Sequence, residues 1–392
     1  MDVVRRLVTR DHLEGVARAA LGTEHRLVGV SRLRGGSKKG VYRLTFDDDS
    51  TAIAYIWDDA ENYWPTTGAD EADSHADPFS PASGIELFEA AHRHLDALGI
   101  RTPRIRLADQ SRKHYPADVA VVEDVPGDNL ETLLRQDPRS VEATMAQLAE
   151  ALGAMQRHQG PRFGKVALID NGGTSEGSSS EQVVLDRALN DLTEAASRDT
   201  RITHSRHRLV NVVRELAAAV RPRSQYGLIH GELGPDHVLV DRHGQPVLID
   251  TEGLMFFDAE WEHAFLRLRF GDHYRWLNSG DLDEERLTFY TLAMHLSLVP
   301  AGAIFFPPLQ QLHVSRVWEG AQPVRTPPVF RPHRDMFRQC HGRIVLRRAE
   351  ERACITGHLP DPRGCPAGHH SVHRILVQSQ TPPLGRGLPP ST

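Results

Sequence analysis

The chain has 392 residues, of which 40% are hydrophobic and 25% charged, the composition of a soluble globular protein. Its formal net charge of -6 gives no support to nucleic-acid binding. No apolar run approaches the roughly 20 residues that span a bilayer, and the N-terminal segment lacks the apolar core of a signal peptide, so we expect a cytoplasmic protein without membrane contact. The sequence gives no indication of the oligomeric state.

The first predicted elements are two strands within residues 31–57. VYRLTF and TAIAYIW are rich in strand-forming residues and are joined by the polar turn DDDS. The glycine-rich turn GGSKKG precedes the first strand. A helix follows, because apolar residues recur at helical spacing at Ile85, Phe88, His92 and Leu95.

The pattern changes from strands to helices after residue 125. DVAVVEDV, at 118–125, predicts a strand that stops at Pro126 and Gly127. Two apolar stripes at helical spacing then follow. Their residues are Val141, Met145, Leu148, Leu152 and Met155 in the first, and Leu209, Val212, Leu216 and Val220 in the second. We therefore expect an α+β protein with a strand-rich first part and a helix-rich second part.

The stretch LIHGELGPDHVLVD, at 228–241, concentrates titratable groups in a tight loop. VLV and PVLI flank the turn DRHGQ, which predicts a hairpin with Asp250 at its far end. The loop and the hairpin thus bring Glu232, His237 and Asp250 toward one place. Phosphoryl transfer uses such a set, since one carboxylate orients the attacking hydroxyl and two further groups hold the metal on the ATP phosphates.

This stretch resembles the catalytic loop of the aminoglycoside phosphotransferase and choline-kinase-like families. The family pattern is H-G-D-x-x-x-x-N followed by a metal-binding aspartate, and this chain reads His230-Gly231-Glu232-x4-His237, with IDTEG at 249–253. The resemblance runs in the correct order over about 30–300.

The resemblance implies a two-lobed protein-kinase-like fold, with a small antiparallel-sheet lobe and a larger, mostly helical lobe. Residues 1–125 would form the nucleotide-binding lobe and residues 126–300 the catalytic and acceptor-binding lobe. The implied nucleotide contacts are Gly35, Gly36, Ser37, Lys38, Lys39 and Gly40 in the glycine-rich turn, Glu89 in the helix that pairs with a phosphate-binding lysine, and Glu123 and Val125 in the hinge.

The resemblance also implies roles in the catalytic loop. Glu232 and Asp250 would be the catalytic carboxylates, with Asp250 and His237 as metal ligands and with ATP and Mg²⁺ as cofactors. In this loop type the imidazole at the position of His230 holds the backbone, so we expect it to be structural. Asp250 ends an apolar strand, where a carboxylate is costly unless a metal or a charged partner compensates it.

Three positions depart from the family pattern. Glu232 replaces an aspartate, which lengthens the arm by one methylene. His237 replaces a metal-binding asparagine, and because Mg²⁺ prefers oxygen ligands, Mn²⁺ is an alternative cofactor. Asp236 is an alternative ligand, although its position points it elsewhere. The lysine expected on the strand TAIAYIW is missing, with Tyr55 near its place, so Lys38 or Lys39 is the candidate replacement.

Two functions remain open from the sequence. One is a phosphotransferase that moves the γ-phosphate of ATP to a hydroxyl of a small molecule; the other is a degenerate relative that acts as a nucleotide-binding or scaffold module. The acidic segment SGDLDEER, at 279–286, suits an aminoglycoside-like or other amino-bearing acceptor, but a solvated helix face explains its charges equally well. GGSKKG alone also fits an ordinary turn, and Glu89 alone fits a surface charge.

Residues 301–392 have a different composition from the rest. They contain 12 Lys and Arg against 5 Asp and Glu, and 13 of the 25 prolines, whereas residues 1–300 contain 34 Lys and Arg against 47 Asp and Glu. We expect a poorly structured basic tail, either a disordered extension or residues that do not continue the fold. Cys354 and Cys365 each begin a C-x3-H spacing, which leaves a zinc site as an alternative.

Overall fold

The computed structural model describes residues 8–33, 38–62, 75–278 and 281–298 of the chain. Gly35, Gly36 and Ser37 of the predicted nucleotide turn, and the whole predicted tail, lie outside these ranges. Among the described helices, none combines the length and the apolar character needed to cross a membrane.

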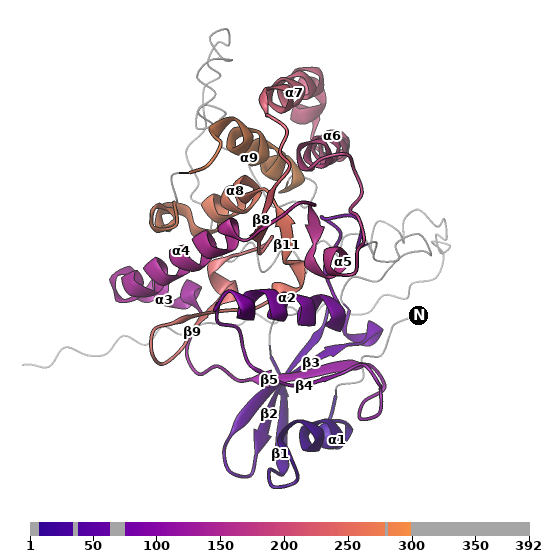
Figure 1. Ribbon diagram of the computed structural model, residues 1–392, viewed down its shortest axis with the longest axis vertical. Coiled ribbons are helices and arrows are strands. Elements are labelled where there is room, and N and C mark those ends of the chain that lie inside the picture. The colour runs from indigo at the N-terminus through magenta and orange to yellow at the C-terminus, as the bar shows by residue number, and fades with distance from the viewer. Residues whose placement is uncertain (1–7, 34–37, 63–74, 279–280, 299–392) are drawn as a thin grey trace, which may run out of the picture. The chain divides into compact units, whose positions relative to one another are not determined.

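The N-terminal lobe is built on an antiparallel sheet of five strands in the order β1-β2-β3-β5-β4 (Figure 1). The strands predicted from VYRLTF, TAIAYIW and DVAVVEDV are confirmed as β2, β3 and β5. The sheet consists of β1 (Leu27–Arg32), β2 (Gly40–Phe46), β3 (Thr51–Trp57), β4 (Ile105–Asp109) and β5 (Asp118–Glu123).

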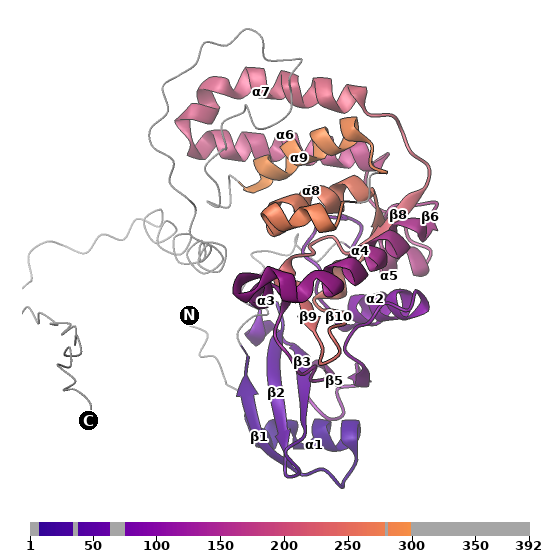
Figure 2. The ribbon, with the colours of Figure 1, turned by 90° about the vertical axis from the view of Figure 1, so that its left-hand side faces the viewer.

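Each face of this sheet packs against a different helix. Because strand residues alternate between faces, Tyr42 and Leu44 point to the face covered by helix α1 (Arg10–Leu21). Ile53 and Val122 point to the opposite face, where α2 (Ile85–Ala97) packs. Helix α2, predicted from its apolar spacing, lies between the sheet and the C-terminal helices in both views (Figures 1 and 2). The face toward α2 is therefore the one that meets the second lobe.

The segment between the lobes packs directly on a hairpin of the second lobe. The sheet ends at Glu123, and helix α3 (Leu130–Gln136) follows. Gly127 has a φ of 135°, and a Cβ there would lie 2.1 Å from the carbonyl oxygen of Val240. The amide of Val240 donates to the carbonyl of Asp128 at 3.0 Å. Glycine at 127 is what allows this close approach of two backbones.

The C-terminal lobe is mostly helical, as predicted. Its helices are α4 (Glu142–Arg157), α5 (Val166–Asp170), α6 (Ser180–Arg198), α7 (Thr200–Ala219), α8 (Ala259–Phe270) and α9 (Glu284–Leu298). The two predicted apolar stripes lie on α4 and α7, except that Val141 directly precedes α4 and Val220 directly follows α7. Helices α6, α7 and α9 lie side by side (Figure 2).

Short strands carry the loops of the C-terminal lobe. A sheet in the order β6-β8-β11-β7 contains β6 (Gln159–Gly160), β7 (Gly164–Lys165), β8 (Tyr226–Ile229) and β11 (Met255–Phe257). The predicted hairpin is confirmed as β9 (Val238–Val240) and β10 (Pro246–Leu248), which pair antiparallel. The loop 230–237 thus lies between β8 and β9, and Asp250 follows β10.

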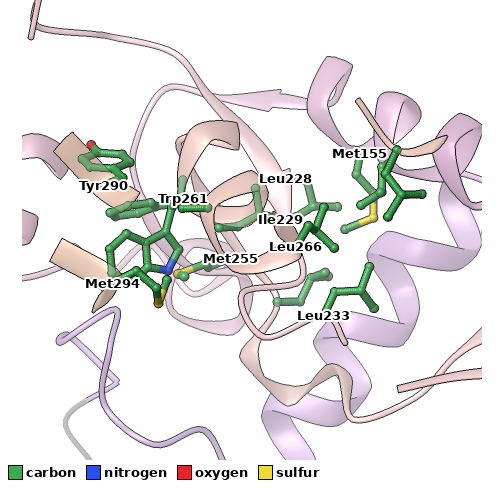
Figure 3. Close-up of a cluster of buried hydrophobic side chains, with 14 of the residues drawn as sticks. Met155, Leu228, Ile229, Leu233, Met255, Trp261, Leu266, Tyr290 and Met294 are labelled. Carbon is green, nitrogen blue, oxygen red and sulfur yellow. The ribbon is translucent and has the colours of Figure 1, made fainter. Parts of the chain in front are cut away.

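A buried apolar cluster holds these strands against the helices (Figure 3). Leu228 and Ile229 of β8, Leu233 of the loop and Met255 of β11 all expose less than 5% of their surface. Trp261 and Leu266 of α8 pack against the same cluster, as does Met155 of α4. The loop 230–237 is therefore attached at both ends to rigid structure.

Candidate active site

His230 ties the loop to the strand that precedes Asp250. Its ring is fully buried, and Nε2 lies 3.1 Å from the carbonyl oxygen of Ile249, to which it donates a hydrogen bond. Burial, with His237 as a second cause, lowers the pKa of His230 to about 4, so the ring is neutral. This geometry agrees with the structural role expected for His230.

Glu262 of α8 binds the backbone of the same loop. Its carboxylate Oε2 accepts a hydrogen bond of 2.8 Å from the amide of Gly231, and the side chain is buried. Burial raises the pKa of Glu262 to about 7, against the opposing effect of backbone amides in the loop. We did not predict this residue from the sequence. Glu260 and His263 flank it closely in α8, so the local sequence gave no apolar pattern that would single it out.

His237 presents one ring nitrogen to the carboxylate of Asp250. Its Nδ1 lies 2.8 Å from the carbonyl oxygen of Glu232, and because a carbonyl only accepts, Nδ1 carries the hydrogen. Its other ring nitrogen, Nε2, lies 3.6 Å from Oδ2 of Asp250. The carbonyl of Glu232 thus orients the ring so that Nε2 is the atom that faces Asp250.

Asp250 has a backbone conformation that is uncommon for residues other than glycine. Its φ of 60° and ψ of 45° place it in the left-handed region, and its side chain is 47% exposed. The Lys39 ammonium, 3.1 Å from Oδ1, holds the pKa of Asp250 well below its usual range. Asp250 is therefore an ionised carboxylate with one oxygen toward Lys39 and the other toward His237.

Lys39 reaches the residues that follow the β9–β10 hairpin from the N-terminal lobe. Its ammonium is bonded to the buried carboxylate of Glu252 as well as to Asp250. It also lies 4.8 Å from the ring centre of Tyr55, the β3 residue near the place of the missing lysine. Burial alone would lower the pKa of Lys39, but Glu252 and Asp250 outweigh burial and raise it. Lys39 thus brings a positive charge to the place where the strand has none.

Asp236, the alternative ligand, is held by another partner. Its Oδ1 accepts a hydrogen bond of 2.5 Å from Arg269 of α8. Its Oδ2 lies 3.9 Å from Nε2 of His237, farther than the oxygen of Asp250. The arrangement agrees with the expectation that Asp236 points away from the metal position.

The remaining predicted site residues differ in their burial and in their distance from Asp250. Glu232 is exposed at the tip of the loop. Gly40 opens β2, where a Cβ would lie 2.8 Å from the carboxyl carbon of Glu61. Lys38 is adjacent to Lys39 in the turn. Val125 is 6% exposed in the segment that joins the lobes.

Glu89 and Glu123 direct their carboxylates elsewhere. Oε2 of Glu89 accepts a hydrogen bond of 3.3 Å from Gln110, and the α2 side chain that meets Tyr55 is Phe88, with ring centres 5.7 Å apart. The structure therefore does not bring Glu89 to Lys39. The carboxylate of Glu123 is paired with Arg101, at 2.8 Å from Nη2, which leaves the Glu123 backbone as its candidate nucleotide contact.

Asp250 and His237 supply two candidate donors for a divalent cation, and within the described residues no group of three or more His, Cys, Asp or Glu side chains is arranged to hold a metal. Oδ2 of Asp250 and Nε2 of His237 face each other, and the other oxygen of Asp250 binds the Lys39 ammonium. A mixed oxygen and nitrogen set suits Mn²⁺ better than Mg²⁺, which prefers oxygen ligands.

Comparison with known proteins gives one family and a set of structures. The sequence pattern of the phosphotransferase enzyme family matches residues 30–283. No sequence among the curated proteins matches the chain.

Three solved structures share the fold at low sequence identity. A thermostable mutant of the aminoglycoside phosphotransferase APH(4)-Ia, in ternary complex with AMP-PNP and hygromycin B, is 15% identical, with a TM-score of 0.50 over 86% of this chain and 98% of that one. AMP-bound spectinomycin phosphotransferase APH(9)-Ia is 12% identical, with a TM-score of 0.50 over 79% and 92%. A candidate aminoglycoside phosphotransferase from Ralstonia eutropha is 12% identical, with a TM-score of 0.51 over 74% and 88%. The likeness establishes a protein-kinase-like fold, as expected from the sequence.

Proposed function

The chain belongs to the phosphotransferase enzyme family, and we propose that it transfers the γ-phosphate of ATP to a hydroxyl group of a small molecule. The observation that carries the proposal is the meeting of Asp250, His237 and Lys39 between the two lobes. The Lys39 ammonium, together with a metal ion held by the carboxylate and the imidazole, would supply the positive charge that phosphoryl transfer needs.

Asp250 and His237 would hold the metal. Oδ2 of Asp250 and Nε2 of His237, 3.6 Å apart, are the two ligand atoms. Mg²⁺ or Mn²⁺ bound there supplies positive charge to the phosphate oxygens of ATP. The buried carboxylate of Glu252, two residues after Asp250, also binds the Lys39 ammonium and so keeps it close to the site.

Lys39 takes the place of the lysine that the family has on β3. Its position on the inner side of the sheet, against Tyr55, puts its ammonium next to the metal ligands. Lys38 and the glycines of the same turn would cover the phosphates with their backbone amides. The adenine would contact the backbone of Glu123 and Val125 in the segment between the lobes, with residues 1–125 and 126–300 acting as the two lobes.

Glu232 is the residue that orients the acceptor hydroxyl. Its exposed carboxylate stands on a loop that His230, Gly231 and Glu262 hold in place. The acceptor hydroxyl gives its proton to Glu232 as its oxygen forms the bond to the γ-phosphorus. The bond from that phosphorus to the β-γ bridging oxygen breaks, and ADP leaves.

The acceptor is a small molecule that carries hydroxyl and amino groups. Two of the structural neighbours, by their names, act on aminoglycoside-type antibiotics. In this chain the segment at 279–286 and Asp272 are acidic, which favours a cationic acceptor.

A second function deserves a direct test, because Glu232, His237 and Tyr55 all depart from the family pattern. A scaffold module with the same fold would bind nucleotide without turning it over. The experiment measures ADP formation with Mg²⁺ and with Mn²⁺, over a panel of aminoglycosides and simple amino alcohols, for the full chain and for Glu232→Gln.

Acceptor-dependent ADP formation that the Glu232→Gln change removes supports the enzyme. A thermal shift with AMP-PNP and metal but no turnover of any acceptor supports the scaffold. The absence of both responses contradicts ATP binding altogether.

A further inference from the structure

Lys39 bridges the two lobes by binding the carboxylates of Asp250 and Glu252. It precedes β2 of the sheet lobe, whereas Asp250 and Glu252 follow β10 of the helical lobe. The lysine side chain is 9% exposed and the Glu252 side chain 5%. Lys39 and Glu252 are therefore enclosed together, whereas the Asp250 side chain is 47% exposed at the edge of the site.

The ammonium lies on the carboxylate that would bind the metal. Nζ is 3.1 Å from Oδ1 of Asp250, while Oδ2 of the same group faces Nε2 of His237. A divalent cation on Oδ2 would share the carboxylate of Asp250 with the Lys39 ammonium on Oδ1. Two positive charges on the two oxygens of one carboxylate repel each other strongly in a partly buried site. The metal and Lys39 thus compete for the same negative charge.

Rotation of its side chain would bring the Lys39 ammonium to another partner. Lysine carries its charge on a flexible four-carbon stem. The face of the Tyr55 ring, 4.8 Å from Nζ, offers a second favourable contact for the ammonium during such a change. The phosphates of a bound nucleotide would offer a stronger one.

We propose that Lys39 is a tethered cation that occupies the carboxylates of Asp250 and Glu252 until nucleotide phosphates draw it away. The proposal rests on the proposed function, because it concerns the same nucleotide site. It makes metal binding weak in the absence of nucleotide and strong in its presence, so that metal and nucleotide enter together. The positive charge of Lys39 thus neutralises the carboxylates before nucleotide binds and the phosphates afterwards.

The test measures Mn²⁺ binding to the full chain in the absence of nucleotide. Free Mn²⁺ is followed by electron paramagnetic resonance, and the metal-induced change in Tm is followed in parallel. Lys39→Met keeps the length of the side chain and removes its charge, so we expect at least about tenfold tighter Mn²⁺ binding and a larger rise in Tm. Lys39→Arg keeps the charge and should bind Mn²⁺ as weakly as the unchanged chain.

Two further variants make the result specific. Lys113→Met removes an exposed lysine far along the chain and should leave Mn²⁺ affinity unchanged. Glu252→Gln introduced into Lys39→Met should abolish most of the gain, since the uncompensated pair of carboxylates is then lost. Lys39→Gln repeats the measurement if Lys39→Met fails to fold.

Equal or weaker Mn²⁺ binding by the uncharged variants would overturn the proposal, as would an equal gain in Lys113→Met. The comparison needs neither nucleotide nor turnover. A chain that fails the phosphotransferase assay can therefore still support or overturn the role of Lys39, and the two failures are distinguishable.

Discussion

His237 and Asp250 face each other from the two ends of one hairpin, with Nε2 of the imidazole 3.6 Å from Oδ2 of the carboxylate. The amide of Ile249 donates to the carbonyl of His237 at 3.0 Å, so the backbone fixes this spacing. The hairpin thus carries both proposed metal ligands as one unit.

The first prediction concerns the metal preference of this pair. His237→Asn restores an oxygen ligand, which Mg²⁺ prefers, so we expect the ratio of Mn²⁺-supported to Mg²⁺-supported kcat/KM to fall about tenfold, or about 1.4 kcal/mol. Steady-state kinetics with each metal gives the ratio. His237→Ala is the control and should lower the rate with both metals. An unchanged ratio in His237→Asn would show that the imidazole is not a ligand.

The second prediction separates the charge of Glu232 from its length. Glu232→Gln removes the carboxylate that orients and deprotonates the acceptor, and should lower kcat by about 10² to 10⁴. Glu232→Asp keeps the charge on a shorter arm and should lose at most about a hundredfold. Single-turnover rates at saturating ATP measure both. Equal losses in the two variants would rule out a role for the charge.

The third prediction uses the pKa of about 7 at Glu262. The unfolded carboxyl has an ordinary pKa of 4.5, so between these values the folded chain holds a proton that the unfolded chain has released. The contribution of Glu262 to stability is therefore present below pH 4.5 and is lost as the pH rises through 7, by about 3 kcal/mol in total.

Glu262→Gln cannot titrate at this position. Relative to the unchanged chain, its free energy of unfolding should rise between about pH 4.5 and pH 7 and level off above pH 7. Urea unfolding at several pH values measures the difference. A difference that stays constant with pH would contradict the burial of an ionisable carboxyl beneath the loop.

The fourth prediction concerns the contact between the lobes at Gly127. A methyl group there would lie 2.1 Å from the carbonyl oxygen of Val240, at a φ of 135°. Gly127→Ala should therefore destabilise the fold by about 2–4 kcal/mol. Gly84→Ala is the matched control, because Gly84 has a similar φ of 123° but nothing lies within 4 Å of its Cβ position, and it should cost at least about 1 kcal/mol less. Comparable losses in the two variants would mean that strain, and not the contact, is responsible.

The elements that could be predicted are those with strong local patterns. The strands β2 and β3, the helices α2 and α4, and the hairpin before Asp250 all follow from periodicity and turn chemistry. Helix α6 is not among the predicted elements. Its buried stripe includes the weakly apolar Ala188 and Ala195, which give little contrast in hydrophobicity with the polar face. Glu232, His237 and Asp250 were placed near one another by the spacing of the loop and hairpin.

The contacts that could not be predicted join distant segments. Nothing in the sequence near Lys39 indicates that its ammonium reaches Glu252, which is 213 positions away. The same holds for Glu262 and the amide of Gly231. Such contacts are made by tertiary structure and not by local pattern. By contrast, the apolar spacing of α2 already places Phe88 on the face toward the sheet, and its contact with Tyr55 agrees with that pattern.

The packing of the hairpin on the segment between the lobes has a mechanical consequence. The hairpin that holds His237 and Asp250 is also bonded to that segment through Val240 and Asp128, and Gly127 lies against it. Rotation of one lobe against the other therefore strains the hairpin that sets the ligand spacing. The electron paramagnetic resonance spectrum of a paramagnetic ion bound between His237 and Asp250 would therefore change as the two lobes rotate relative to each other.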